Sequence, residues 1–155
     1  MPTLQYIGGS HQKELSVDFG RKSRDIVWSD KYRACFPEIK LRQDQSGKTY
    51  HQNTKGGWRY STSTGGGVTG LHGHLIVVDD PIDPRKAVSE VELKNANDWM
   101  RDTLSQRKVD QAKTPTILIM QRLHQDDPTN NMINRAKGAQ RIAIQAGEEL
   151  SLIHI

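Results

Sequence analysis

Two adjacent carboxylates, Asp79 and Asp80, follow four aliphatic residues in the stretch "GHLIVVDDP" at 73–81. An apolar run of this length is typical of a buried strand, where neighbouring charges are costly unless they have a use. The pattern matches a Walker B strand, in which the first carboxylate holds Mg²⁺ and the second orients and polarises the water that attacks the γ-phosphate of ATP. A strand that ends in an ordinary Asp-Pro turn would carry the same residues.

A Walker B strand requires a Walker A segment, G-x-x-x-x-G-K-[ST], between a strand and a helix. The chain contains "GKT" at 47–49, but Arg42 occupies the position where the first glycine belongs. The residues that follow, "YHQNTKGGW", are typical of a strand and a turn, so Lys48 is predicted to be a turn residue. The glycine-rich stretch 65–73 contains no lysine. The chain therefore holds half of an ATPase site.

Further polar side chains follow a second apolar run, "TPTILIM" at 114–120. These side chains are Gln121, Arg122, His124, Asp126 and Asp127. In open α/β sheets, ligands bind beyond the carboxyl ends of the strands. If this strand is the neighbour of the one that ends at Asp79, we expect the two groups of side chains to converge at one site.

A metal-dependent hydrolase is a second interpretation of the same region. His72 and His74 form a His-x-His pair, and imidazole combined with the carboxylates of residues 79, 80 and 126 and with His124 suits zinc or manganese. However, Asp79 lies five residues beyond His74, which is roughly 17 Å along an extended strand and too far to share one ion. We interpret these histidines as ordinary loop residues.

The composition limits the class of protein. The chain has 155 residues, of which 34% are hydrophobic, and its mean hydropathy is −0.72. No run approaches the ~20 apolar residues of a spanning helix, and the start has no pattern of a secretory signal. Cys35 is the only cysteine, so no internal disulfide can form, and a reducing cytoplasm is the expected setting. The net charge of +4 permits contact with nucleic acid without establishing it.

The expected elements alternate between strands and helices. Strands are predicted at 3–9, 38–43, 48–54, 57–64, 74–78, 114–120 and 140–146. Helices are predicted from a cap at Ser10 to about Ser29, at 29–36, at 89–107 behind a capping box formed by Ser89 and Glu92, and at 129–138. This alternation, with unrelieved apolar strand cores, predicts an α/β sheet that helices cover on both faces.

Taken together, these pieces resemble, in order, the ATPase domain of the large terminase subunit of tailed bacteriophages. The similarity covers about residues 4–149. It is carried by the stretches "GGSHQKELSVDFGRKSRDIV", "TKGGWRYSTSTGGGVTGLHGHLIVVDDPI", "SEVELKNANDWMRDTLSQR", "ILIMQRLHQDDPT" and "RIAIQAGEE". The longest of them, at 54–82, contains the predicted Walker B strand and is the most specific.

The resemblance implies an additional-strand P-loop ATPase that uses ATP and Mg²⁺ to drive double-stranded DNA into a procapsid. By position, Asp79 would hold Mg²⁺ and Asp80 would be the catalytic carboxylate, and both would contact the nucleotide. Gln121 would sense the γ-phosphate at the coupling position, where the family more often has threonine, with Arg122 beside it as a further catalytic candidate and His124 nearby. Asp126 and Asp127 are expected to shape the loop.

The resemblance also implies partners and missing parts. The expected partners are a portal protein, a small terminase subunit and further copies of the chain in a ring, in the cytoplasm of an infected bacterium. A Walker A segment would precede the first strand, and a nuclease domain would follow residue 149. We therefore interpret residues 1–149 as a partial ATPase domain, inactive alone, and 150–155 as an unassigned tail. The sequence does not identify the arginine finger, the arginine that would contact the γ-phosphate. The candidates are Arg21, Arg24 and Arg107. A helicase-like or other P-loop ATPase, and a non-enzymatic DNA-binding or assembly module, are alternatives.

Overall fold

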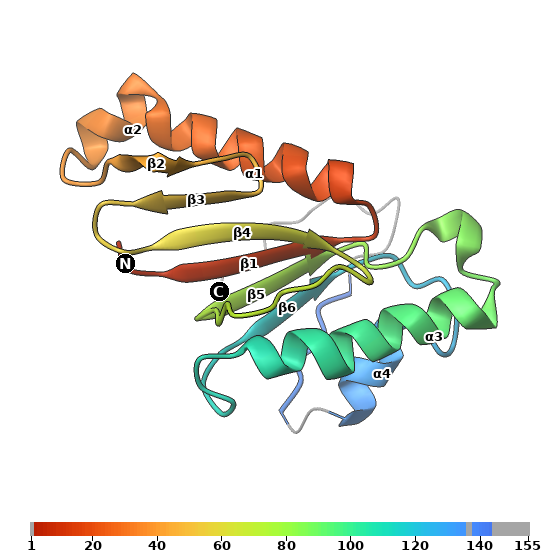
Figure 1. Cartoon of the computed structure of the whole chain (residues 1–155). Coiled ribbons are helices and arrows are strands. Elements are labelled where there is room, and N and C mark those ends of the chain that lie inside the picture. Colours follow the sequence, from red (N-terminus) through yellow and green to blue (C-terminus); the bar gives the residue numbers. More distant parts are fainter. Residues whose placement is uncertain (1, 136–137, 144–155) are drawn as a thin grey trace.

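One mixed sheet organises the part of the chain that the computed structural model describes, residues 2–135 and 138–143. Its strand order is β2-β3-β4-β1-β5-β6 (Figure 1). The strands are β1 (Gln5–Ser10), β2 (Leu41–Ser46), β3 (Tyr50–Asn53), β4 (Trp58–Ser63), β5 (Leu75–Asp79) and β6 (Thr116–Ile119). The helices are α1 (Lys13–Trp28), α2 (Asp30–Cys35), α3 (Glu90–Asp98) and α4 (Pro128–Arg135), with a short 3₁₀ turn, η1 (Pro84–Lys86). The predicted α/β class, with helices flanking a sheet, is confirmed.

Strands β4, β1, β5 and β6 run parallel to one another. Their carboxyl ends therefore lie along one side of the sheet, which we call the carboxyl edge. Strands β2 and β3 extend the sheet as an antiparallel hairpin beyond β4. In the parallel part, Ser10 lies opposite both Ser63 and Asp79, and Asp79 lies opposite Ile119. This register brings the loops after the four parallel strands to a common place.

One face of the sheet, the α3 face, carries the main apolar core. Helix α3 continues into a π-helical turn, η2 (Trp99–Leu104), and a 3₁₀ turn, η3 (Ser105–Arg107). The buried side chains of this core are Ile7, Trp58, Val68, Ile76, Val78, Trp99 and Leu104. Trp99 packs so closely on Gly9 that an added Cβ there would lie 2.7 Å from the indole ring. A side chain at position 9 would therefore displace the Trp99 indole from its place on the sheet.

The opposite face, the α1 face, is covered only in part. Helix α1 packs on β4 and β1, and an added Cβ at Gly20 would lie 2.4 Å from the Lys48 carbonyl oxygen. On β6, the side chains of Ile117 and Ile119 are 47% and 54% exposed. They share the α1 face with Asp79, because side chains alternate along each paired strand. The expected cover by helices is therefore only partial on the α1 face.

Most predicted elements have a counterpart in the structure. Ser89 caps α3 by accepting a hydrogen bond from the Glu92 amide, and Lys48 lies in the turn between β2 and β3. The predicted cap at Ser10 is wrong, because this residue ends β1 and α1 begins only at Lys13. Residues 140–143 form no strand, and the rest of the strand predicted at 140–146 lies outside the described residues. Among the helices that the structure describes, none is long and apolar enough to cross a membrane.

A buried histidine in the hairpin gives the fold a pH dependence. His51 of β3 is only 5% exposed, and burial, with the nearby charges of Arg59 and Arg24, lowers its pKa from 6.5 to about 4. The unfolded chain therefore binds more protons between these values, so the free energy of unfolding should fall as the pH falls from 6.5 to 4. The loss is at most about 3 kcal/mol.

Urea unfolding at a series of pH values tests this expectation, with His51→Gln as the comparison. The variant should be less sensitive to pH between 6.5 and 4.5, because glutamine does not titrate. An equally steep loss of stability in the variant would assign the effect to another group.

Candidate active site at the carboxyl edge

The loops after β1, β5 and β6 meet at the carboxyl edge. The Asp80 amide donates a hydrogen bond to the Ile119 carbonyl oxygen (2.9 Å), and the His11 amide donates one to the Asp80 carbonyl oxygen (2.8 Å). Strands β5 and β6 are direct neighbours, so the condition for the two groups of polar side chains to converge is met. Gln121, two residues after the end of β6, therefore lies in the loop next to the Asp79–Asp80 pair.

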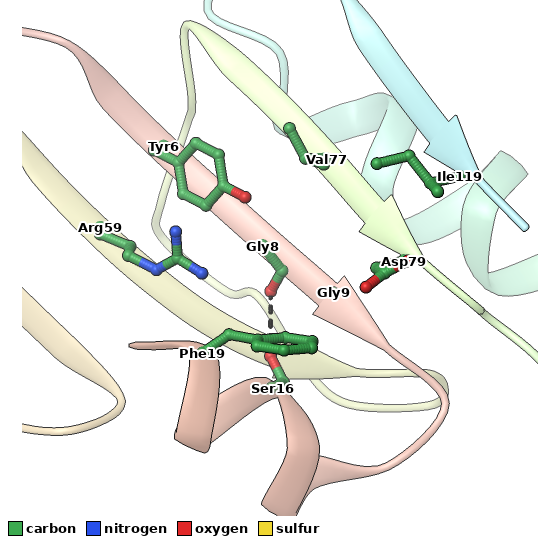
Figure 2. A pocket seen from close by; sticks show the side chains of 9 residues that line it. All are labelled: Tyr6, Gly8, Gly9, Ser16, Phe19, Arg59, Val77, Asp79 and Ile119. Carbon is green, nitrogen blue, oxygen red and sulfur yellow. Dashed lines mark hydrogen bonds between the residues drawn. The ribbon is translucent and has the colours of Figure 1, made fainter. Parts of the chain in front are cut away.

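Asp79 lines a hollow on the α1 face (Figure 2). The hollow lies between β5 and α1, with Gly8 at its floor and the ring of Phe19 at its side. Arg59 also lines it, and its guanidinium stacks on the ring of Tyr6 at 4.4 Å from the centroid. Burial, and then the charge of Asp80, raise the pKa of Asp79. A carboxylate in this position is stabilised by any cation that binds beside it.

Asp80 has an unusual backbone conformation. Its φ is +45°, and it is the only non-glycine residue with a positive φ in the described part of the chain. Most L-residues avoid this left-handed region, although aspartate tolerates it better than most. The chain therefore turns sharply directly after Asp79, and β5 ends there.

The two carboxylates fit a hard divalent cation in part. Neither Asp79 nor Asp80 forms an ion pair with Lys or Arg in residues 2–135 and 138–143, and carboxylate oxygens are ligands that Mg²⁺ accepts. Groups of three or more His, Cys, Asp or Glu side chains that could hold a metal are absent from the described residues. Mg²⁺ commonly keeps several water and phosphate ligands, so one or two carboxylates are sufficient for it and insufficient for a zinc centre.

The loop after β6 is organised by Asp127. This buried carboxylate accepts hydrogen bonds from Arg122 Nε (2.9 Å) and from the amides of Leu123 (3.1 Å) and Asn130 (3.1 Å). Burial alone would favour its neutral form, but these bonds and one from the His124 amide outweigh that effect and lower the pKa of Asp127. The expectation that this residue shapes the loop agrees with this geometry.

The other predicted residues of this loop differ in their contacts. Arg122 is held by Asp127 and also donates to the His124 carbonyl oxygen (3.3 Å), so its guanidinium is engaged within the loop. His124 Nδ1 accepts a hydrogen bond from the Asp126 amide (3.1 Å). Gln121 is exposed and forms no side-chain hydrogen bond with the described residues. The exposed side chain of Gln121 is therefore free to meet a ligand beside the Asp79–Asp80 pair.

The histidines of the alternative hydrolase site lie elsewhere. His74 precedes β5, and its Nδ1 accepts a hydrogen bond from the Gln5 amide at the start of β1 (3.2 Å). This is the amino end of the strands, whereas Asp79 lies at the carboxyl end. Arg107 is also at the amino end, where its carbonyl oxygen accepts from the Gly73 amide. The structure therefore does not bring His72 or His74 together with the carboxylate pair.

The remaining arginine candidates are engaged on α1. Arg21 forms ion pairs with Asp18 and Asp25. Arg24 pairs with Asp25 and stacks on Trp28. These contacts within the helix leave neither guanidinium at the carboxyl edge of its own chain.

Two residues of the carboxyl edge escaped the sequence analysis. His11 follows β1 and Thr64 follows β4, and both bind the backbone of the Asp80–Pro81 turn. The rule that ligands bind beyond the carboxyl ends of strands also applies to these two loops. Their positions directly after β1 and β4 could have identified them. For His11 this was hidden, because the predicted cap at Ser10 placed it in the first turn of a helix.

The fold and the site define an α/β protein with a paired-carboxylate site at the carboxyl edge of a parallel sheet. Comparison of the sequence with protein-family models and with curated proteins finds no match.

Proposed function

We propose that this chain is the Walker B part of a P-loop ATPase domain of the additional-strand type. In the whole protein, Mg²⁺-dependent hydrolysis of ATP would drive double-stranded DNA into a phage procapsid, with a portal protein and a small terminase subunit as partners and a ring of copies as the motor. The observation that carries the proposal is the pair of Asp79 and Asp80 at the carboxyl edge, beside the loop after β6. The resemblance of the sequence to the large terminase subunit supports the packaging role.

The two carboxylates would have separate tasks in this mechanism. Asp79, which lies among apolar side chains on the α1 face, would hold Mg²⁺, and the ion would neutralise charge on the phosphates. Asp80 would orient and polarise the attacking water. Gln121, exposed at the end of the next strand, would contact the γ-phosphate. Arg122 is engaged by Asp127, so we assign it a role in holding the loop rather than in contacting ATP.

The sheet has room for the phosphate-binding segment that the mechanism requires. β6 is the last strand of the described sheet, and its isoleucines are exposed on the α1 face. The connection from β1 to β4 contains α1, which lies on the α1 face. The connection from β5 to β6 runs in the opposite direction across the sheet and contains α3, which lies on the other face. Since parallel crossovers are right-handed, a strand beside β6 that led through a helix into β1 would lay that helix on the α1 face. Its loop would face Asp79.

Measurement of ATP hydrolysis tests the proposal. The 155-residue chain should show no turnover, because it contains no G-x-x-x-x-G-K-[ST] segment to bind the phosphates. A longer polypeptide with G-x-x-x-x-G-K-[ST] ahead of residue 1 should hydrolyse ATP when Mg²⁺ is present. If that polypeptide folds, binds ATP and fails to hydrolyse it with DNA and its partners present, the ATPase proposal is wrong.

A non-enzymatic DNA-binding or assembly module is the second candidate. The observation that favours it is a groove between η2 and α4, which Arg101, Lys108 and Arg135 line together with Met100 and Leu104. This candidate predicts binding to double-stranded DNA that weakens steeply with salt and does not change with nucleotide. DNA affinity measured at several salt concentrations, with and without ATP, separates it from the ATPase proposal.

A further inference from the structure

The turn at Asp80 is held by two neighbouring loops of the sheet. Both the amide and the ring Nδ1 of His11 lie within hydrogen-bond distance of the Asp80 carbonyl oxygen, at 2.8 and 3.0 Å. Because a carbonyl oxygen can only accept, Nδ1 must carry the proton. Thr64 Oγ1 donates to the Pro81 carbonyl oxygen (2.6 Å), and the Thr64 amide donates to the Ser10 carbonyl oxygen (2.9 Å). Loops from β1 and β4 thus bind consecutive carbonyl groups of the turn.

These bonds hold a backbone conformation that the sequence at the turn disfavours. Asp80 has a φ of +45°, and a residue directly before proline prefers an extended conformation. A non-glycine residue in the left-handed region is strained and persists only where its surroundings hold it. The bonds from His11 and Thr64 supply this restraint, because they fix the direction of both carbonyl groups.

We propose that His11 and Thr64 are positioning residues for the carboxylate pair. They keep Asp80 left-handed, so that the chain leaves the sheet directly after Asp79 and the two carboxylates are set at a fixed angle to each other. This inference rests on the proposed function in one respect, the binding of a divalent cation by Asp79. Neither residue needs to touch the cation or the nucleotide to have this effect.

The conformation of Asp80 is measured by NMR on the metal-free chain, from the three-bond HN–Hα coupling and the backbone chemical shifts. The wild-type chain should show a left-handed Asp80. The His11→Asn variant should also show it, because the side-chain amide of asparagine can donate in place of the ring Nδ1. His11→Ala should show an extended or averaged conformation. Thr64→Val should shift Asp80 in the same direction, whereas Thr69→Val, in an exposed loop of the same region, should not. A left-handed Asp80 retained in His11→Ala would overturn the proposal.

Binding of Mn²⁺, detected by broadening of the Asp79 and Val78 amide signals, is the second measurement. His11→Ala should weaken this binding about tenfold, the loss typical of outer-shell partners of metal ligands. The same substitution made in an Asp80→Gly background should change it less than about threefold, because glycine adopts a positive φ without support. An equal loss in both backgrounds would contradict a positioning role and point to His11 as a direct ligand.

The two measurements separate this inference from the proposed function. If Mn²⁺ does not broaden the Asp79 signals of the wild-type chain, the assignment of Asp79 to the cation fails. The restraint on Asp80 is still decided by its conformation in the metal-free variants.

Discussion

Replacing Asp80 with asparagine in the longer polypeptide should lower the turnover of ATP by about 10²- to 10⁴-fold. The reason is that the carboxylate that polarises the attacking water is lost, while the size of the side chain is kept. Asparagine also tolerates a positive φ at least as well as aspartate, so the turn at φ +45° should survive. Steady-state hydrolysis at saturating ATP and Mg²⁺ measures the effect.

The matched control is Asp126→Asn, which removes a nearby carboxylate whose side chain is 67% exposed. Its turnover should stay within a few-fold of the wild-type value, and both variants should unfold at the wild-type urea concentration. Unchanged hydrolysis in Asp80→Asn would remove the catalytic assignment of that residue.

The Asp127→Ala substitution should lower the free energy of unfolding by about 2–4 kcal/mol. The buried carboxylate satisfies the amides of Leu123, His124 and Asn130 and holds the guanidinium of Arg122. Alanine leaves the three amides without their acceptor at a position that is fully buried. Urea unfolding of the two proteins, followed by circular dichroism, measures the difference.

The pH dependence of this effect has a definite sign. The pKa of Asp127 lies below its ordinary value of 3.8, so its stabilising contribution is fully present above about pH 4 and is lost as the pH falls below that value. The difference in the free energy of unfolding between wild type and Asp127→Ala should therefore become smaller below about pH 4. Asp126→Ala, which removes an exposed carboxylate and keeps the backbone contacts, should stay within about 0.5 kcal/mol of wild type. A gap that is constant down to pH 2 would show that Asp127 acts without its charge.

Local sequence patterns predicted most of the elements that position the site. The aliphatic run before Asp79 and the capping residue Ser89 predicted β5 and α3, because burial and helix caps depend on a few neighbouring residues. These features require no knowledge of which distant strands pair.

Features that depend on the pairing of strands far apart in the sequence could not be predicted from such local patterns. Ser10 has the composition of a helix cap, but its pairing with β4 and β5 keeps it in the sheet. The bonds of His11 and Thr64 to the turn require the register of three strands. The contact of Arg122 with Asp127 was also missed. The Asp127 carboxylate accepts from the Asn130 amide at the start of α4 and from Arg122 at the same time, and the sequence does not show that one side chain has both partners.

The exposed outer strand has a practical consequence for the isolated chain. The sequence of β6, "TILI", has no charged residue and no proline, and two of its isoleucines face solvent. Strand β6 is the outermost strand of the sheet in residues 2–135 and 138–143, and edge strands of this kind are templates for pairing with other chains. The isolated polypeptide is therefore expected to self-associate as its concentration rises, and the loss of soluble protein on storage would begin at β6.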